Sequence, residues 1–132
     1  MDWNALTHNP RTLLGYYDAA PSLEQVALHR VTLLRDGPTA EIVFNASTFP
    51  QRPSPRWPQG ANTCQITLRA IGISSVVLDA WSTNPVGELS IVSVQGALEV
   101  AFNGAGRVRL VCSNLDVAHV SGYVSDRGID SV

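Results

Sequence analysis

The sequence predicts a mainly β domain, built as an antiparallel two-layer sandwich or a strongly curved sheet of about eight strands, with one or two short N-terminal helices. From residue 26 onward, apolar and polar residues alternate with a period of two, which is typical of strands with one buried face. Gly, Pro, Asn and Ser interrupt the alternation at short intervals, and the 132 residues leave no room for the long crossovers of parallel strands. We therefore expect one domain over residues 1–132.

The N-terminal part lacks this alternation and is predicted to form the short helices. One candidate segment begins at Asn9-Pro10 and runs to Tyr17. In the other, Pro21–Gln25, Ser22 and Gln25 have the spacing of a capping box, which favours a helical turn. Neither segment is long enough to be stable alone, so we expect both to pack over the end of the sheet.

The first four strands are expected near residues 27–35, 40–46, 64–71 and 76–78. Asp36-Gly37-Pro38 is a strong turn signal between the first two strands. Gly72 ends the alternation of the third strand shortly before Val76-Val77-Leu78 begins the fourth. The break at Gly72 therefore predicts a second hairpin.

The clearest hairpin lies late in the chain, between further strands expected near residues 88–94 and 115–124. Its two strands are joined by Asn103-Gly104-Ala105-Gly106, whose residues tolerate the positive φ of tight turns. Glu99, Arg107 and Arg109 should face outward. The residues expected on the buried face are Leu98, Val100, Phe102, Val108, Leu110 and Cys112.

A proline-rich stretch, Phe49–Gly60, separates the second strand from the third. Its four prolines forbid a central strand and favour a loop with extended polyproline geometry. Trp57, within this loop, is either exposed or folded back onto the core. Trp3 and Trp81 lie next to apolar segments, so we expect them to be partly buried.

Composition excludes several classes of partner and location. The nine basic residues, all of them Arg, are not clustered, and the net charge is -2, which argues against nucleic-acid binding. No apolar run reaches the roughly 18 residues of a membrane span, and Met1–Leu6 does not resemble a secretion signal. We expect a cytoplasmic protein in which Cys64 and Cys112 are free and buried.

The sequence holds no recognisable catalytic, cofactor or metal-binding constellation. No Gly-x-Ser-x-Gly elbow is present, and His8, His29 and His119 share no motif. Neither cysteine has a second thiol or a histidine at metal-ligand spacing. These observations predict a non-catalytic protein that binds no cofactor or metal, and whose function is to bind another molecule.

The chain resembles the Immunity protein 50 family of bacterial polymorphic toxin systems over nearly its full length. The likeness rests on apolar patterns and a few Trp, Gly and Pro positions and on no catalytic signature. The matching segments are Trp3, Gly15-Tyr16-Tyr17 to Pro21-Ser22-Leu23, the Trp57 loop, Cys64 to Leu78, Glu88 to Val94, Val108 to Cys112 and Leu115 to Tyr123. The resemblance implies a cytoplasmic antitoxin that binds and neutralises a cognate toxin domain.

Two hypotheses of different classes follow. The first is the non-catalytic immunity protein, and the alternative is a small β-sandwich module that binds carbohydrate or another ligand. For a protein partner, Arg52, Arg56 and Trp57 are the predicted contact residues, because prolines lower the ordering cost of their loop and Arg and Trp are common hot-spot types. A stiff connector is the competing interpretation of this loop, and the oligomeric state stays open.

Overall fold

The computed structural model describes residues 3–83 and 85–125, and it has one antiparallel sheet of eight strands that does not close into a barrel. The prediction of a strongly curved, mainly β sheet is confirmed. Two short helical segments, η1 (Trp3–Leu6) and α1 (Arg11–Leu14), precede the strands. The strands are β1 (Val26–Leu34), β2 (Thr39–Asn45), β3 (Thr63–Ile71), β4 (Ser75–Asp79), β5 (Val86–Val94), β6 (Ala97–Gly104), β7 (Arg107–Cys112) and β8 (Asn114–Tyr123).

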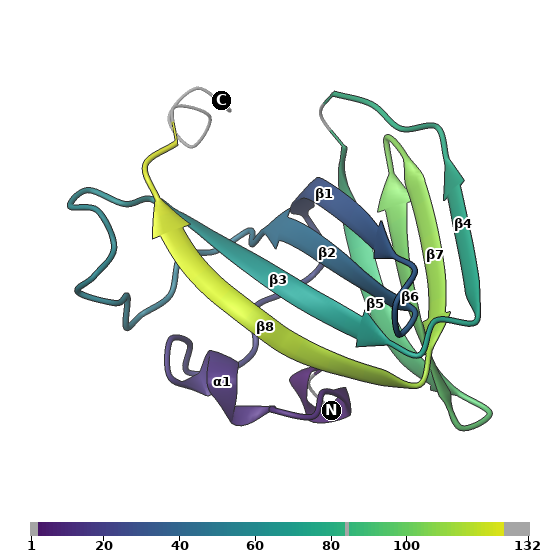
Figure 1. Cartoon of the computed structure of the whole chain (residues 1–132). Helices are drawn as coiled ribbons and strands as arrows, with labels where there is room; N and C mark the ends of the chain where they lie inside the picture. Colours follow the sequence, from purple (N-terminus) through teal and green to yellow (C-terminus); the bar gives the residue numbers. More distant parts are fainter. Residues whose placement is uncertain (1–2, 84, 126–132) are drawn as a thin grey trace.

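The sheet consists of two four-stranded ladders that meet at a short seam. The strand order is β4-β7-β6-β5-β1-β2-β3-β8, and the seam between β5 and β1 has only two residue pairs, Val26 with Gly87 and Ala27 with Val86. Figure 1 shows the two ladders at an angle to each other, with the N-terminal segment beside β8. The two inner faces enclose one core, to which both ladders contribute buried side chains.

The turn at Asp36-Gly37-Pro38 joins β1 and β2 as predicted. The second predicted hairpin is wrong, because β3 pairs with β2 and β8, whereas β4 pairs with β7. Gly72, at φ +73°, begins a corner through which the chain leaves one ladder for the other. The amides of Gly72 and Ile73 both donate to the carbonyl of Pro38. The glycine at position 72 located the end of β3 but carried no information about which strand β4 pairs with.

The late hairpin has the predicted register. Leu98, Val100 and Phe102 lie opposite Cys112, Leu110 and Val108, and these six side chains lie on the inner face, all buried except the half-buried Leu98. On the outer face, Arg109 pairs with Glu99 at 2.9 Å. The expectation of positive φ in its turn is wrong. Gly104 is needed for a close approach instead, because a Cβ there would lie 2.3 Å from the carbonyl oxygen of Val86.

The N-terminal segment crosses an open end of the curved sheet. The amide of His8 donates to the carbonyl of Leu115 in β8, and at the other end the amide of Leu89 in β5 donates to the carbonyl of Leu23. Two helical segments form, but the helical turn expected at Pro21–Gln25 does not: only a turn at residues 24–25 forms there, and Ser22 Oγ accepts a bond from the Glu24 amide. Its place is taken by η1, which begins at Trp3.

The three tryptophans differ in exposure. Trp3 is half-buried and donates to the carbonyl of Pro21 at 2.9 Å, as predicted. Trp81 is 55% exposed, so the prediction of its partial burial is wrong. It follows the end of β4, after Ala80 at φ +56°, and this turn carries it away from the core. No helix among the described residues is long and apolar enough to cross a membrane.

Candidate partner-binding surface

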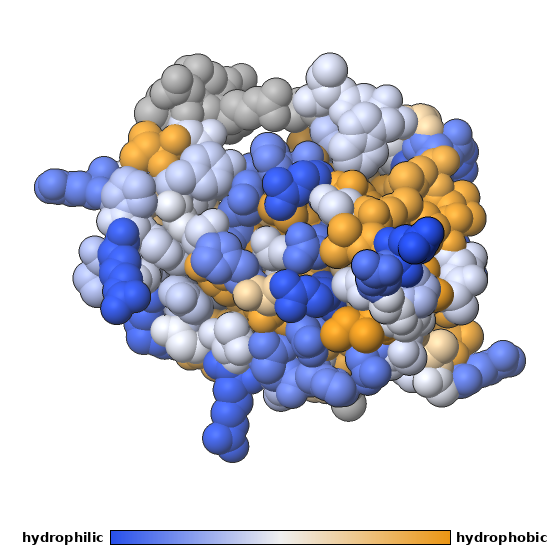
Figure 2. All heavy atoms as spheres, viewed as in Figure 1, coloured by the Kyte–Doolittle hydropathy of each residue, from blue (hydrophilic) through white to orange (hydrophobic). Residues whose placement is uncertain are grey.

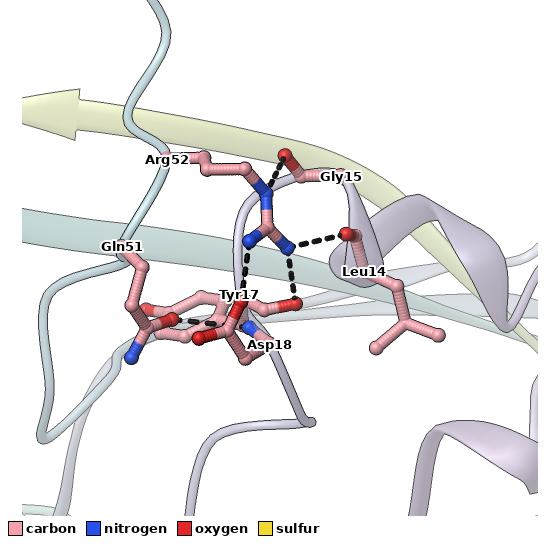
Figure 3. A network of polar contacts seen from close by, with 6 residues as sticks. All are labelled: Leu14, Gly15, Tyr17, Asp18, Gln51 and Arg52. Atoms are coloured by element: carbon pink, nitrogen blue, oxygen red, sulfur yellow. Dashed lines mark hydrogen bonds and ion pairs between the residues drawn. The ribbon is translucent and has the colours of Figure 1, made fainter.

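Arg52 joins the proline-rich loop to the N-terminal segment (Figure 3). Its guanidinium forms an ion pair with Asp18 and donates to three carbonyls, those of Leu14, Gly15 and Tyr17, at 2.8 to 3.4 Å. Its own amide donates to the carbonyl of Tyr16 at 2.9 Å. The carbonyls just after a helix lack partners within it, so Arg52 supplies the donors that this segment needs.

The loop beyond Arg52 is folded into turns. The amide of Trp57 donates to the carbonyl of Ser54, and the amide of Ala61 donates to that of Pro58. A continuous polyproline helix, which has no internal hydrogen bonds, is therefore not what this sequence forms. The turns bring Trp57 back towards the sheet.

Trp57 packs in an aromatic cluster between the N-terminal segment and β8. Its ring stacks on Tyr16 with centroids 5.4 Å apart and an interplanar angle of 4°, and it meets the edge of Phe49 at 5.8 Å. A Cβ on Gly122 of β8 would lie 2.2 Å from Cε3 of Trp57. Glycine at position 122 therefore makes the space in which the indole lies against the strand.

Two surface hollows share Trp57 as a wall. One, of about 420 Å³, is lined by side chains from three separate parts of the chain, including Tyr16, Arg56, His119 and Ser121. The other, of about 340 Å³, is lined by the loop itself, from Phe49 to Ala61. We call Tyr16, Arg56, Trp57, His119 and Ser121 the Trp57 surface.

Arg56 and His119 are the basic groups of the Trp57 surface, and both are exposed. Within the described residues, the Arg56 guanidinium forms no ion pair. An exposed arginine without an acidic partner can form bidentate bonds with a carboxylate of another molecule. The Trp57 surface therefore combines aromatic area with an available cation.

The structure separates the three predicted contact residues. It brings Arg56 and Trp57 into the same hollow, whereas the guanidinium of Arg52, although its side chain is 49% exposed, is engaged in bonds within the chain. Sequence reasoning missed Tyr16, His119 and Ser121. The alternation of β8 could have placed His119 and Ser121 on its outer face, but their contact with a loop some 60 residues away needs the tertiary structure.

A third hollow, of about 500 Å³, lies at the seam between the ladders. Trp81, Pro85 and His29 contribute to its wall, together with Asn45 and Tyr123 from neighbouring strands. The buried Oγ of Ser82, another lining residue, has no hydrogen-bond partner in the described part of the protein. An exposed indole beside amide and hydroxyl groups is chemically suited to a ligand with both apolar and polar faces.

The groups with perturbed pKa lie in the core, away from these hollows. Burial raises the pKa of the Tyr17 phenol, and its contact with Cys64 raises it further. Burial likewise raises the pKa of the Cys64 and Cys112 thiols. All three groups are therefore held neutral, and Tyr17 donates to the carbonyl of Thr48 at 2.7 Å. No group of three or more potential metal-ligating side chains occurs in residues 3–83 and 85–125.

Comparison with known proteins identifies a family. The sequence profile of the family described as Immunity protein 50 matches residues 9–123, a span that includes every residue of the Trp57 surface. No curated protein and no solved structure matches the chain.

Proposed function

The chain belongs to the Immunity protein 50 family, and we propose that it is a non-catalytic immunity protein that binds and neutralises a cognate toxin domain of a bacterial polymorphic toxin system. The observation that carries this proposal is the family match over residues 9–123. An inhibitor of this kind must occupy a surface of the toxin and needs no chemistry of its own. We place its action in the cytoplasm of the cell that it protects.

We assign the toxin contact to the Trp57 surface. Its loop is held by the Arg52 clamp and by internal turns, so binding would order little additional backbone and would keep more of the interaction energy. Trp, Tyr and Arg are the side chains that most often dominate interface energetics. Arg56 and His119 favour a toxin surface that carries carboxylates.

In this proposal, Arg52 positions the proline-rich loop and does not itself contact the toxin. Its guanidinium holds the loop to the N-terminal segment and leaves toxin contact to Arg56, Trp57 and their neighbours. An interface of ordinary size around such a patch is sufficient for a nanomolar Kd, about -12 kcal/mol.

The proposal is tested with the toxin domain encoded beside this chain. Co-expression should rescue cells from the toxin, and titration of purified toxin should end at a fixed stoichiometry. Arg56→Glu should weaken inhibition at least tenfold without changing the melting temperature. The matched control is Arg35→Glu, an exposed arginine in the β1–β2 turn, which should inhibit like the wild type.

One result would contradict the non-catalytic immunity function, and another would contradict only the assignment of the toxin contact. Loss of toxin activity at strongly substoichiometric protein, with covalent change of the toxin, would reveal an enzyme. Equal inhibition by the Arg56→Glu and Arg35→Glu proteins would leave the immunity function standing but would move the contact away from the Trp57 surface.

The hollow beside Trp81 supports a second candidate function, carbohydrate binding. An exposed indole can stack on a sugar ring, and Asn45, His29 and Tyr123 in the same hollow offer hydrogen-bonding groups. A glycan array with wild-type protein and with Trp81→Ala separates this function from toxin inhibition. Signals that vanish in the Trp81→Ala protein would support sugar binding, and an array without signals would dismiss it.

A further inference from the structure

The two edges of the sheet are treated differently by the rest of the chain. At the β8 edge, the side chain of Asn9 donates to the carbonyl of Val117 at 2.8 Å and accepts from its amide at 2.9 Å. The amide of His8 bonds Leu115, and the pairing of β8 is interrupted by a bulge beside Thr67. Covering segments and bulges are common means of preventing a strand from pairing with another chain.

Among the residues that the structure describes, none protects the β4 edge in this way. Its five residue pairs with β7 run without a register shift, and β4 contains no proline or lysine. Its one charged residue, Asp79, is bound to Arg107 of β7 at 2.8 Å. Within the described ranges, no hydrogen bond reaches the main chain of β4 from the side opposite β7.

Two of the three apolar side chains of β4 are also exposed. Leu78 lies opposite the buried Val108 and so belongs to the inner face, yet it is 48% exposed, because the sheet ends at β4. Val77, on the outer face opposite Arg109, is 51% exposed. Figure 2 shows hydrophobic atoms gathered on the side of the molecule where Figure 1 places β4. A further strand at this edge would cover Leu78 and continue the inner face.

We propose that β4 is a dimerisation edge, which pairs in antiparallel fashion with β4 of a second copy about a two-fold axis at Val77. This register places Val76 opposite Leu78 of the second copy and Ser75 opposite its Asp79, and Val77 opposite its own equivalent. No like charges oppose each other. Opposed β-branched and aliphatic side chains are favourable cross-strand pairs.

Symmetry favours a second copy over a foreign strand as the occupant. Every residue of β4 finds its complement in β4 itself, so that the contact is isologous and closes at two copies. At the β8 edge, Asn9 and His8 occupy main-chain groups of Val117 and Leu115, which opposes continued pairing from that edge into an open polymer. The pairing also leaves the Trp57 surface free, since that surface is built from the N-terminal segment, the proline-rich loop and β8.

Sedimentation equilibrium over a wide concentration range tests the dimer without any toxin. Wild-type protein should shift from the chain mass to twice that mass as its concentration rises. Val77→Lys should remain at the chain mass, because two lysines would face each other across the axis. The matched control is Val92→Lys, an exposed outer-face valine of β5 that pairs with Glu99 of β6, which lies away from β4 and should still dimerise.

Cross-linking of a Val77→Cys variant provides a readout that does not depend on a weakened interface. Directly opposed residues of antiparallel strands have Cα atoms about 4.5 to 5.5 Å apart, which a disulfide can span. With an added mild oxidant, the variant should form a disulfide-linked dimer, and Val92→Cys should not. Wild-type protein that stays at the chain mass at every concentration, or Val77→Lys and Val92→Lys proteins that dimerise equally, would overturn the proposal. A monomer that captures a toxin strand at β4 would also overturn it.

Discussion

Arg52 illustrates how one side chain can fix a surface that it does not itself form. Its guanidinium reaches Leu14, Gly15, Tyr17 and Asp18, and so connects the loop that carries Trp57 to the segment that carries Tyr16. The stacking of these two rings then depends on a residue outside their contact. Residue type alone could not separate this internal role from the hot-spot role expected of an arginine in a loop.

Arg52→Ala should lower the free energy of unfolding by about 1 to 2 kcal/mol, because charged donors to carbonyls are worth more than neutral ones but this site is partly exposed. Arg52→Lys should recover little, since an ammonium lacks the planar fork. Urea denaturation measures both variants. Arg56→Ala is the matched control and should unfold like the wild type. Equal stability of the Arg52→Ala and wild-type proteins would show that the clamp contributes nothing.

The buried thiols and the Tyr17 phenol make stability fall at alkaline pH. Their pKa values are raised by burial in the folded protein, so the folded state holds protons that the unfolded state loses above about pH 8.5 for a thiol and pH 10 for a phenol. Below those values their contribution is constant. Stability should therefore decrease from about pH 8.5 upward, by up to about 1.4 kcal/mol per pH unit for each group.

Unfolding free energies measured from pH 6 to 10 test this slope. The comparison is a Cys64→Ala, Cys112→Ala double variant, whose stability should be lower throughout but should decline less between pH 8.5 and 10. In the native protein, both thiols should also resist a soluble thiol reagent at pH 8. A double variant with the wild-type slope would exclude the thiols as its cause.

At the scale of elements, β8 depends on the N-terminal segment to complete its hydrogen bonding. Asn9 replaces a strand residue by satisfying both the amide and the carbonyl of Val117. Asn9→Ala should therefore cost about 1 to 3 kcal/mol, because two main-chain groups of Val117 lose their partners. Amide hydrogen exchange at Val117 should accelerate, while Val100 in β6 stays protected. Unchanged exchange at Val117 would show that other groups protect this edge.

The comparison of sequence with structure is also clearest at this scale. Alternation located all eight strands and fixed the register of β6 and β7, since a one-residue slip would have exposed Phe102 and Leu110. It could not pair β4 with β7, because Gly72 marks a break whether the chain turns back or crosses to another ladder. The prolines identified the loop but could not locate Trp57 within the structure. The position of the Trp57 ring depends on the space that Gly122 leaves on β8, a strand far away in the sequence.

At the scale of the whole molecule, the two ladders are joined weakly by backbone pairing at the seam but strongly by the core that they share. Only two residue pairs join β1 to β5, so backbone hydrogen bonding alone would allow the two ladders to separate. The core, however, is shared: Phe44 and Ile66 of one ladder and Phe102 and Leu110 of the other belong to a single buried cluster. Because each ladder would expose its inner face if it separated, the ladders should unfold together.

We therefore expect a single cooperative unfolding transition, with tryptophan fluorescence and far-UV circular dichroism coinciding. Phe102→Ala removes a fully buried ring from the β5-β6-β7 side of the core and should cost about 3 to 5 kcal/mol. Because Trp81 follows β4 in the ladder of Phe102, the comparison is made in a Trp81→Phe background. Although Trp57 lies on the other ladder, the variant should then shift the fluorescence and dichroism midpoints equally. The matched control is Ala101→Ser on the outer face of β6, which should shift neither by much. If Phe102→Ala moved the dichroism midpoint but not that of fluorescence, the ladders would be separate folding units, and the shared core would not be what holds the sheet together.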